Sequence, residues 1–387
     1  MIYLDHAATT PMLPEAIEVM TEELAQLGNP SSLHNAGRRA RRVVEESREQ
    51  IAEVLHARPS EVIFTSGGTE ADNLAVKGLY WARRDGGRHR ILVTSIEHHA
   101  VLDSVRWLHS HEGADAVYLN VDSEGLLPPE TLAAAIDADP ASVALVSVMY
   151  ANNEVGAVQP IGALAAVAHQ HGIPFHSDAV QAAAHLPVNF AGSGADALTV
   201  TSHKLGGPVG VGALLLRRGI EPVPVLHGGG QERDVRSGTL DAPAIRAFAT
   251  AVVISAERRE AEAKRLSVLR DDLIRQITEV VPDATLNGPP PGPDRLPGNA
   301  HFSFPGCEGD ALLMLLDARD IACSTGSACT AGVAQPSHVL LAMGADEDRA
   351  RGSLRISLGH TSTQDDVDAV VAAIGEAVER ARRAASR

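Results

Sequence analysis

Short apolar runs alternate with amphipathic stretches through the first half of this chain, and this alternation constrains the fold most strongly. The pattern predicts strands at residues 62–65, 91–95, 144–149, 173–176, 197–201 and 211–216. It predicts helices at residues 69–81, 99–109 and 161–170. Apolar, β-branched strands separated by helices are typical of an α/β fold with a mostly parallel sheet covered on both faces. Functional side chains of such sheets are expected at the carboxyl ends of the strands.

The pattern changes near residue 242. Residues 242–280 are helical in pattern, highly charged and longer than most globular helices, so we expect a connector out of the first domain. A loop rich in proline and glycine follows at 287–293, and strands and helices then interleave again. We expect a large domain over residues 13–256. A smaller α+β domain is expected over residues 1–12 and 257–387.

The composition excludes several classes of protein. The chain has 387 residues, of which 44% are hydrophobic and 21% charged, as in a soluble globular protein. No apolar run is long enough to span a membrane, and the N-terminus has no signal-peptide pattern, so we expect a cytoplasmic protein. The net charge of −16 argues against stable, direct nucleic-acid binding. A basic cluster at residues 38–42 continues into Glu45, Glu46, Arg48 and Glu49, which indicates a solvated helix face.

The three cysteines are too few for a disulfide framework and are expected to be free thiols. Cys307 and Cys323 follow patterns typical of buried, structural positions. Cys329 lies in a segment of small residues, about 324–335, which favours a mobile loop that presents a thiol to a distant target. Its thiolate could act as a nucleophile if nearby positive charge lowers its pKa.

Lysine is rare, occurring only at positions 77, 204 and 264. Lys204 follows Thr201, Ser202 and His203 and precedes paired glycines, a setting that suits an amine bound covalently to an aldehyde cofactor with its phosphate close by. An amine can form a Schiff base with pyridoxal phosphate (PLP), and a guanidinium cannot. The alternative is a surface lysine in a loop.

Two further segments are compatible with this cofactor. The turn at 65–70 joins a strand to a helix, and its glycines and Thr69 could hold a phosphate at the helix N-terminus; it could also be only a turn with an N-cap. Asp178 directly follows a predicted strand and could pair with a pyridinium nitrogen, or could cap a helix. Gln181 could reach the ring oxygen.

Three other polar positions lie at strand ends or within a strand. The amides of 151–156, including Asn153, follow a buried strand and could bind a ligand or close a turn. His98 follows another strand and could stack on the cofactor ring or transfer protons. Arg355 alternates with apolar neighbours in the strand pattern of 354–358, where it could clamp a substrate carboxylate or lie exposed on a sheet face.

Taken in their order along the chain, the motifs closely resemble those of the cysteine desulfurase family, specifically its IscS/NifS-like class. The resemblance covers nearly the whole chain. Its motifs are Tyr3–Pro11, Gly28–His34, Phe64–Glu70, Glu97-His98, Asn152–Gly156, Asp178–Gln181, Ser202–Lys204, His227–Glu232, Arg236–Thr239 and Ser327–Thr330.

The resemblance implies a homodimeric PLP enzyme of fold type I. It implies that Lys204 holds PLP covalently, His98 stacks on its ring, Asp178 pairs with the ring nitrogen and Gln181 contacts the ring hydroxyl. The phosphate ligands would be Gly68, Thr69, Thr201 and His203, with Thr239 from the other subunit. Asn153 and Arg355 would bind the substrate carboxylate, and Asn153 would also contact the cofactor.

The implied reaction converts L-cysteine to L-alanine and a persulfide on Cys329, with Lys204 removing the Cα proton. The sulfur would pass to acceptor proteins such as an iron–sulfur scaffold or tRNA-thiolation enzymes, and Cys329 could transiently ligate a [2Fe–2S] cluster shared with a partner. Alternatives are a selenocysteine lyase, another PLP lyase or transaminase, or a sulfur-relay scaffold without turnover. The chain departs from the family at His99, a frequent lysine, and at His360-Thr361, often Arg-Phe.

Overall fold

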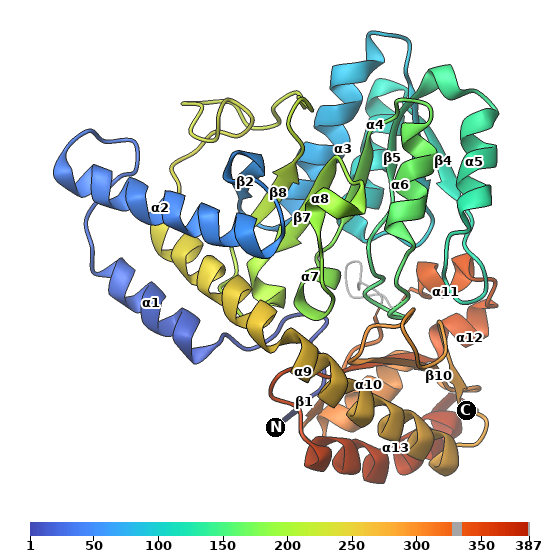
Figure 1. The fold of residues 1–387 in the computed structure, drawn as a ribbon. Helices are drawn as coiled ribbons and strands as arrows, with labels where there is room; N and C mark the ends of the chain where they lie inside the picture. The colour runs from blue at the N-terminus through green and yellow to red at the C-terminus, as the bar shows by residue number, and fades with distance from the viewer. Residues whose placement is uncertain (327–334, 386–387) are drawn as a thin grey trace.

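The computed structural model describes residues 1–326 and 335–385. Its central element is a seven-stranded sheet with the strand order β2-β8-β7-β6-β5-β3-β4 (Figure 1). Strand β8 runs antiparallel to its neighbours β2 and β7, and the other neighbouring pairs are parallel. The prediction of a mostly parallel sheet is therefore confirmed. The strands are β2 (Val62–Thr65), β3 (Arg90–Thr94), β4 (Asp115–Leu119), β5 (Val143–Ser147), β6 (Phe175–Asp178), β7 (Ala197–Thr201) and β8 (Gly212–Leu216).

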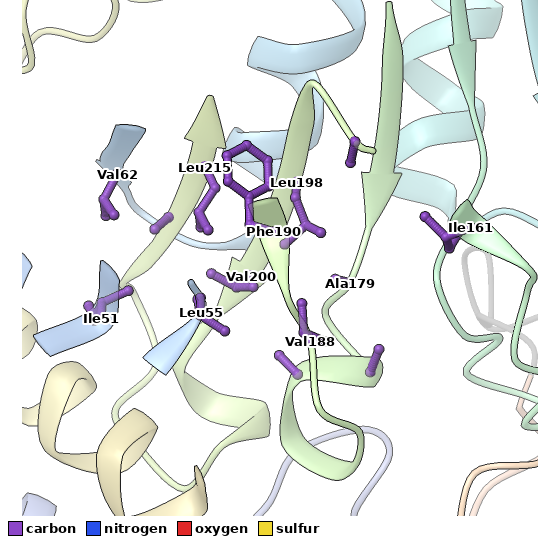
Figure 2. Packing of buried hydrophobic residues seen from close by; sticks show 14 of the residues in the cluster. Ile51, Leu55, Val62, Ile161, Ala179, Val188, Phe190, Leu198, Val200 and Leu215 are labelled. Atoms are coloured by element: carbon purple, nitrogen blue, oxygen red, sulfur yellow. The ribbon is translucent and has the colours of Figure 1, made fainter. Parts of the chain in front are cut away.

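Helices cover both faces of this sheet because its strands are apolar on both sides. Leu214 of β8 packs in a cluster with α3 and α4, whereas its neighbour Leu215 packs in the cluster of the opposite face. Figure 2 shows part of this second cluster, in which Phe190 and Leu198 lie near Leu215. The helices of this region are α2 (Asn35–Val54), α3 (Gly68–Arg84), α4 (His99–Glu112), α5 (Pro129–Asp137), α6 (Ile161–His169), α7 (Ala182–His185) and α8 (Phe190–Ser193).

Two smaller sheets lie below the central one in Figure 1. Strands β9 (Thr285–Leu286), β10 (Asn299–Ser303) and β12 (Ser353–Ser357) form an antiparallel sheet with β10 in the middle. Strand β1 (Ile2–Tyr3) pairs in parallel with β11 (Ile321–Ala322), which brings the N-terminus to this region. The helices here are α10 (Gly309–Asp317), α11 (His338–Ala342), α12 (Glu347–Arg351) and α13 (Gln364–Ala385).

Helix α9 (Ala242–Val280) has 39 residues and takes part in two hydrophobic cores. Its first half contributes Phe248 and Val252 to the core beside the large sheet, where α1 (Pro14–Leu24) and α2 pack along it. Its second half contributes Leu266 and Leu273 to the core around β10 and α13. The predicted domain boundary at residues 256 and 257 falls inside this continuous helix and stays a prediction.

The structure corrects three details of the sequence analysis. Strand β4 was missed; it is a short edge strand that is partly exposed over most of its length. Asp178 is the last residue of β6 rather than the residue after a strand, because it continues the backbone pairing opposite Thr199. The expectation of a solvated face around Arg48 is wrong for that residue: it is buried, and its guanidinium pairs with Glu232 at 2.7 Å.

The described residues include neither a membrane-spanning helix nor a metal-binding group of side chains. None of the helices within residues 1–326 and 335–385 is long and apolar enough to cross a membrane. In the same residues, no three His, Cys, Asp or Glu side chains are grouped in a way that could hold a metal ion.

Candidate active site

A cavity of about 410 Å³ opens at the carboxyl ends of the parallel strands. It lies there because each loop that leaves a parallel strand on this edge brings polar residues to the same place. Thr239 is exposed and does not line the cavity of its own chain, and Cys329 falls outside the described residues. The other predicted site residues all line it: Gly68, Thr69, His98, Asn153, Asp178, Gln181, Thr201, His203, Lys204 and Arg355.

Lys204 ends a single 3-10 turn, Ser202–Lys204, that directly follows β7. Its Nζ donates hydrogen bonds to the carbonyl oxygens of Ala7 at 2.6 Å and Ala8 at 2.5 Å. Burial, and then the charge of Arg355, lower the pKa of Lys204 to about 8, although Asp5 and Asp178 oppose this shift. A substantial fraction of this amine is therefore unprotonated near neutral pH, as a nucleophile or base requires.

Asp178 is 5% exposed and faces the cavity from the end of β6. Its Oδ1 accepts a hydrogen bond from the Val180 backbone N–H at 2.9 Å, so the carboxylate also organises the turn after the strand. Burial raises the pKa of Asp178 to about 6, while the Val180 hydrogen bond and the charge of Lys204 lower it. Three residues later, Gln181 donates from Nε2 to the Ala7 carbonyl at 2.8 Å.

His98 is the N-cap residue of α4, and its Nδ1 accepts a hydrogen bond from the Ala100 N–H at 3.1 Å. Burial, followed by the charge of Lys204, lowers the pKa of His98 to about 4. The ring is thus neutral near pH 7, and because Nδ1 accepts, the proton is on Nε2. A neutral imidazole in this cavity can lie against an aromatic ring and donate from Nε2.

The start of α3 forms the anion-binding end of the cavity. Gly67 has a φ of 147°, and a Cβ at Gly68 would lie 3.1 Å from a methyl of Val180, so glycine permits the start of α3 to lie close to the turn after β6. Thr69 and Thr201 add hydroxyl groups beside the free N–H groups of this helix N-terminus, which attract anions. Burial and then the Lys204 charge lower the pKa of His203 to about 4, so its ring is a neutral hydrogen-bonding group.

Arg355 lies on β12 and is 4% exposed, so the alternative of an arginine on an exposed sheet face is wrong. Its Nη2 pairs with Asp5 Oδ1 at 2.7 Å, and its Nη1 donates to the Asn153 carbonyl at 3.0 Å. Its buried Nε has no hydrogen-bond partner among the described residues. A buried donor without a partner is costly, so Arg355 has capacity left to bind an anionic ligand group.

Several polar residues of the site were not predicted as site residues from the sequence: Asp5, Asp72, His99, Glu154, Ser324 and His338. Asp72 follows Thr69 by three residues, and this helical spacing could have placed it on the same face of α3. Glu154 is buried and accepts a hydrogen bond from the Ser337 hydroxyl at 2.5 Å. His338 donates to the Glu97 carbonyl at 3.0 Å. These long-range contacts left no local pattern in the sequence.

The structure confirms that Cys307 and Cys323 are buried free thiols. Burial, followed by the charges of Asp5 and Asp317, raises the pKa of Cys323 to about 12, while the charge of Arg355 lowers it. A thiol with such a pKa is a poor nucleophile at neutral pH. The role predicted for Cys329 stays a prediction.

The residues of the cavity fit PLP. An amine of lowered pKa, a buried carboxylate, a neutral imidazole and an anion cradle at a helix N-terminus are the groups that this cofactor requires. The unpaired Arg355 Nε adds a donor for the carboxylate of an amino-acid substrate. Fold and site together define a PLP-dependent enzyme of fold type I.

Comparison with known proteins agrees with this class. The family model described as "Aminotransferase class-V" matches residues 2–370. An "IscS-like cysteine desulfurase" of Mycobacterium tuberculosis (strain ATCC 25618 / H37Rv) is 59% identical over 387 residues, which cover 100% of this chain and 98% of the relative. A "Cysteine desulfurase IscS" of Dictyoglomus turgidum (strain DSM 6724 / Z-1310) is 41% identical and covers 98% of this chain and 95% of the relative.

A solved structure described as a "NIFS-LIKE PROTEIN" superposes with a TM-score of 0.90 at 34% identity, covering 98% of this chain and 99% of that one. The chain therefore belongs to the class V aminotransferase family and, within it, to the IscS/NifS-like cysteine desulfurases.

Proposed function

We propose that this protein is a PLP-dependent cysteine desulfurase that converts L-cysteine to L-alanine. The sulfur is carried as a Cys329 persulfide and passed to iron–sulfur cluster assembly and other sulfur-using pathways. One observation carries this proposal: the Lys204 amine, the Asp178 carboxylate and the Arg355 guanidinium line a single cavity. The enzyme acts as a homodimer in the cytoplasm.

Each part of the cofactor has a matching group in the cavity. Lys204 holds the cofactor covalently, and Asp178 pairs with the ring nitrogen. Gln181 contacts the ring hydroxyl, and His98 stacks on the ring face. Asn153 borders both cofactor and substrate. The phosphate is held by Gly68, Thr69, Thr201 and His203, with Thr239 from the partner subunit.

When bound, PLP supplies an electron sink that makes the Cα proton of an amino acid acidic. Arg355 and Asn153 hold the substrate carboxylate. After the substrate amine has replaced Lys204 on the cofactor, the freed Nζ would take the Cα proton. It could do so near neutral pH because burial and Arg355 lower the pKa of the free Lys204 amine to about 8.

The remaining step is sulfur transfer to Cys329. Its thiolate attacks the substrate sulfur, and the S–S bond of the persulfide forms as the C–S bond breaks. The electron pair stays on the carbon fragment, which takes up protons and leaves as alanine. The persulfide then passes to acceptor proteins, and Cys329 can share a [2Fe–2S] cluster with such a partner as cargo.

The test compares Cys329→Ala with Cys323→Ala in the holoenzyme. Cys329→Ala is expected to abolish sulfide and persulfide production while cysteine still changes the cofactor absorbance. Cys323→Ala, in a buried thiol of high pKa, should keep the wild-type rates. Sulfide production by Cys329→Ala at the wild-type rate would refute the mechanism. Purified protein that binds a cluster but yields no alanine would indicate a scaffold instead.

A further inference from the structure

A second buried carboxylate, Asp72, lines the cavity together with Asp178. Asp72 lies on α3 one turn after Thr69 and is only 1% exposed. Its Oδ1 has no hydrogen-bond partner in the described part of the chain. None of the roles proposed above uses Asp72. An unpaired carboxylate oxygen at this depth is costly unless the group is neutral or serves a specific purpose.

Asp72 is the last group of a chain of buried polar side chains beneath Asp178. Ser147 Oγ lies 2.9 Å from His176 Nδ1, and His176 Nε2 lies 3.1 Å from Thr199 Oγ1. The Thr199 hydroxyl in turn bonds to Asp72, and His176 Nε2 lies 3.5 Å from Asp72 Oδ1. Because His176 and Asp178 are two residues apart on β6, their side chains lie on the same face of the sheet.

Burial lowers the pKa of His176 to about 3, so its ring is neutral and has one N–H. If that proton is on Nε2, Ser147 donates to Nδ1, Nε2–H donates to Thr199, and the Thr199 hydroxyl donates to Asp72. If the proton is on Nδ1, the ring donates to Ser147, Thr199 donates to Nε2, and a protonated Asp72 can donate to Thr199. In both arrangements His176 brings no positive charge to Asp72.

The charged groups around Asp72 decide which carboxyl group takes a proton. Asp178 and Glu97 are the acidic neighbours of Asp72, and each raises its pKa when ionised. Because burial raises the pKa of Glu97 to about 8, Asp178 is the neighbour that is charged at neutral pH. Two buried carboxylates that interact do not ionise together at low cost. Asp178 accepts the Val180 N–H and lies near the Lys204 charge, and both favour its ionised form. Neither contact is available to Asp72.

The pKa values of both groups are raised, as expected for an interacting pair. Burial raises the pKa of Asp72 well above its usual range, and so does the charge of Asp178. Burial also raises the pKa of Asp178, to about 6. The pair therefore keeps a proton more readily than two exposed carboxylates would, and the Val180 hydrogen bond favours the ionised form on Asp178.

We propose that Asp72 is a positioning residue that keeps the proton of this carboxyl pair, so that Asp178 stays ionised for the ring nitrogen of the cofactor. An ionised Asp72 would favour a proton on Asp178, and a neutral Asp178 could not balance a protonated ring. This inference rests on the proposed function, because the ring nitrogen is the group that Asp178 serves.

The first test uses the protein without cofactor, labelled with ¹³C at the aspartate carboxyl groups, and infrared difference spectra at pH 7.5. We expect an aspartic acid C=O band in the wild type that disappears in Asp72→Asn. The band should persist in Glu97→Gln, whose carboxyl group is unlabelled. It should shift but remain in Thr199→Val, which removes one hydrogen bond. An unchanged band in Asp72→Asn, or no protonated aspartate in the wild type, overturns the proposal.

The second test uses the holoenzyme with ¹⁵N-labelled PLP and follows the ring-nitrogen chemical shift against pH. In the wild type, Asp72 ionises at high pH and then favours a proton on Asp178, which takes away the charge that balances the ring. Asp72→Asn mimics the protonated Asp72 at every pH, so its ring should keep the proton to a higher pH; an identical titration overturns the coupling. If the wild-type ring is unprotonated throughout, the role of Asp178 in the proposed function fails, whereas the infrared result on Asp72 stands by itself.

Discussion

The lowered pKa of Lys204 can be tested with two substitutions that should shift this pKa in opposite directions. Arg355 and Asp5 form one ion pair beside the lysine, at 2.7 Å. The Arg355 charge lowers the pKa of Lys204 and the Asp5 charge raises it, while burial is the largest cause of the lowered value. Arg355→Gln should therefore raise the pKa of Lys204, and Asp5→Asn should lower it.

The size of the effect follows from the value itself. With a pKa of about 8, about 9% of the Lys204 amine is neutral at pH 7, whereas the ordinary value of 10.5 would leave about 0.03%. Removing a nearby like charge shifts a pKa by roughly one unit. Arg355→Gln should thus lower the neutral fraction at pH 7 about tenfold, and the rate at which the cofactor-free enzyme reacts with PLP should fall by the same factor.

The scarcity of lysine makes this measurement direct. The chain has lysines only at positions 77, 204 and 264, so reductive ¹³C-methylation gives few NMR signals, and Lys204→Arg assigns the one of interest. Its chemical shift is then titrated with pH in the two variants. The electrostatic reasoning is refuted if both variants shift the pKa in the same direction, as general disruption of the site would, or if Lys204 titrates at its ordinary value in the wild type.

Three further predictions concern buried groups. Alkylation of the native protein at pH 8 should spare Cys323 and Cys307, because burial raises the pKa of both thiols; mass spectrometry that finds either modified before unfolding contradicts this. Glu232→Gln removes the buried partner of Arg48 and should cost about 3–5 kcal/mol of unfolding free energy in denaturant titration. Glu45→Gln removes the exposed partner of the same arginine and should cost under about 1 kcal/mol. Similar costs for the two would contradict the burial argument. Burial raises the pKa of Glu97 from 4.5 to about 8, so the folded state retains a proton that the unfolded state releases, and wild-type stability should fall between these pH values. Glu97→Gln should remove that fall in stability. Wild-type and Glu97→Gln proteins whose stability changes with pH in the same way would refute this prediction.

The local sequence was sufficient to predict the central sheet and most of the cavity. Strands β2 and β7 have the predicted bounds because they are short and buried throughout, and helix α9 because no glycine or proline interrupts it after its first turn. Lys204 and Asp178 were found because polar residues at the ends of buried strands must meet at one edge of a parallel sheet. The order of such segments along the chain thus contains information that no single segment has.

Contacts between distant parts of the chain could not be predicted in this way. Arg48 is buried because Glu232, 184 residues away, neutralises it, and nothing in the helix pattern of α2 indicates that partner. Asp5 reaches Arg355 across 350 residues. Asp72 looks like an ordinary polar residue of an amphipathic helix until the sheet beneath it is known. Electrostatic partners depend on the assembled fold, whereas apolar periodicity is local.

Helix α9 has a mechanical and thermodynamic consequence for the whole molecule. At 1.5 Å per residue its 39 residues extend about 58 Å, as one rod with its two halves embedded in different hydrophobic cores. Melting either core would expose the apolar side of half the rod and fray the turns that the other core holds. The two cores should therefore lose their structure together, in one calorimetric transition. A displacement of one core relative to the other would have to bend or twist this rod.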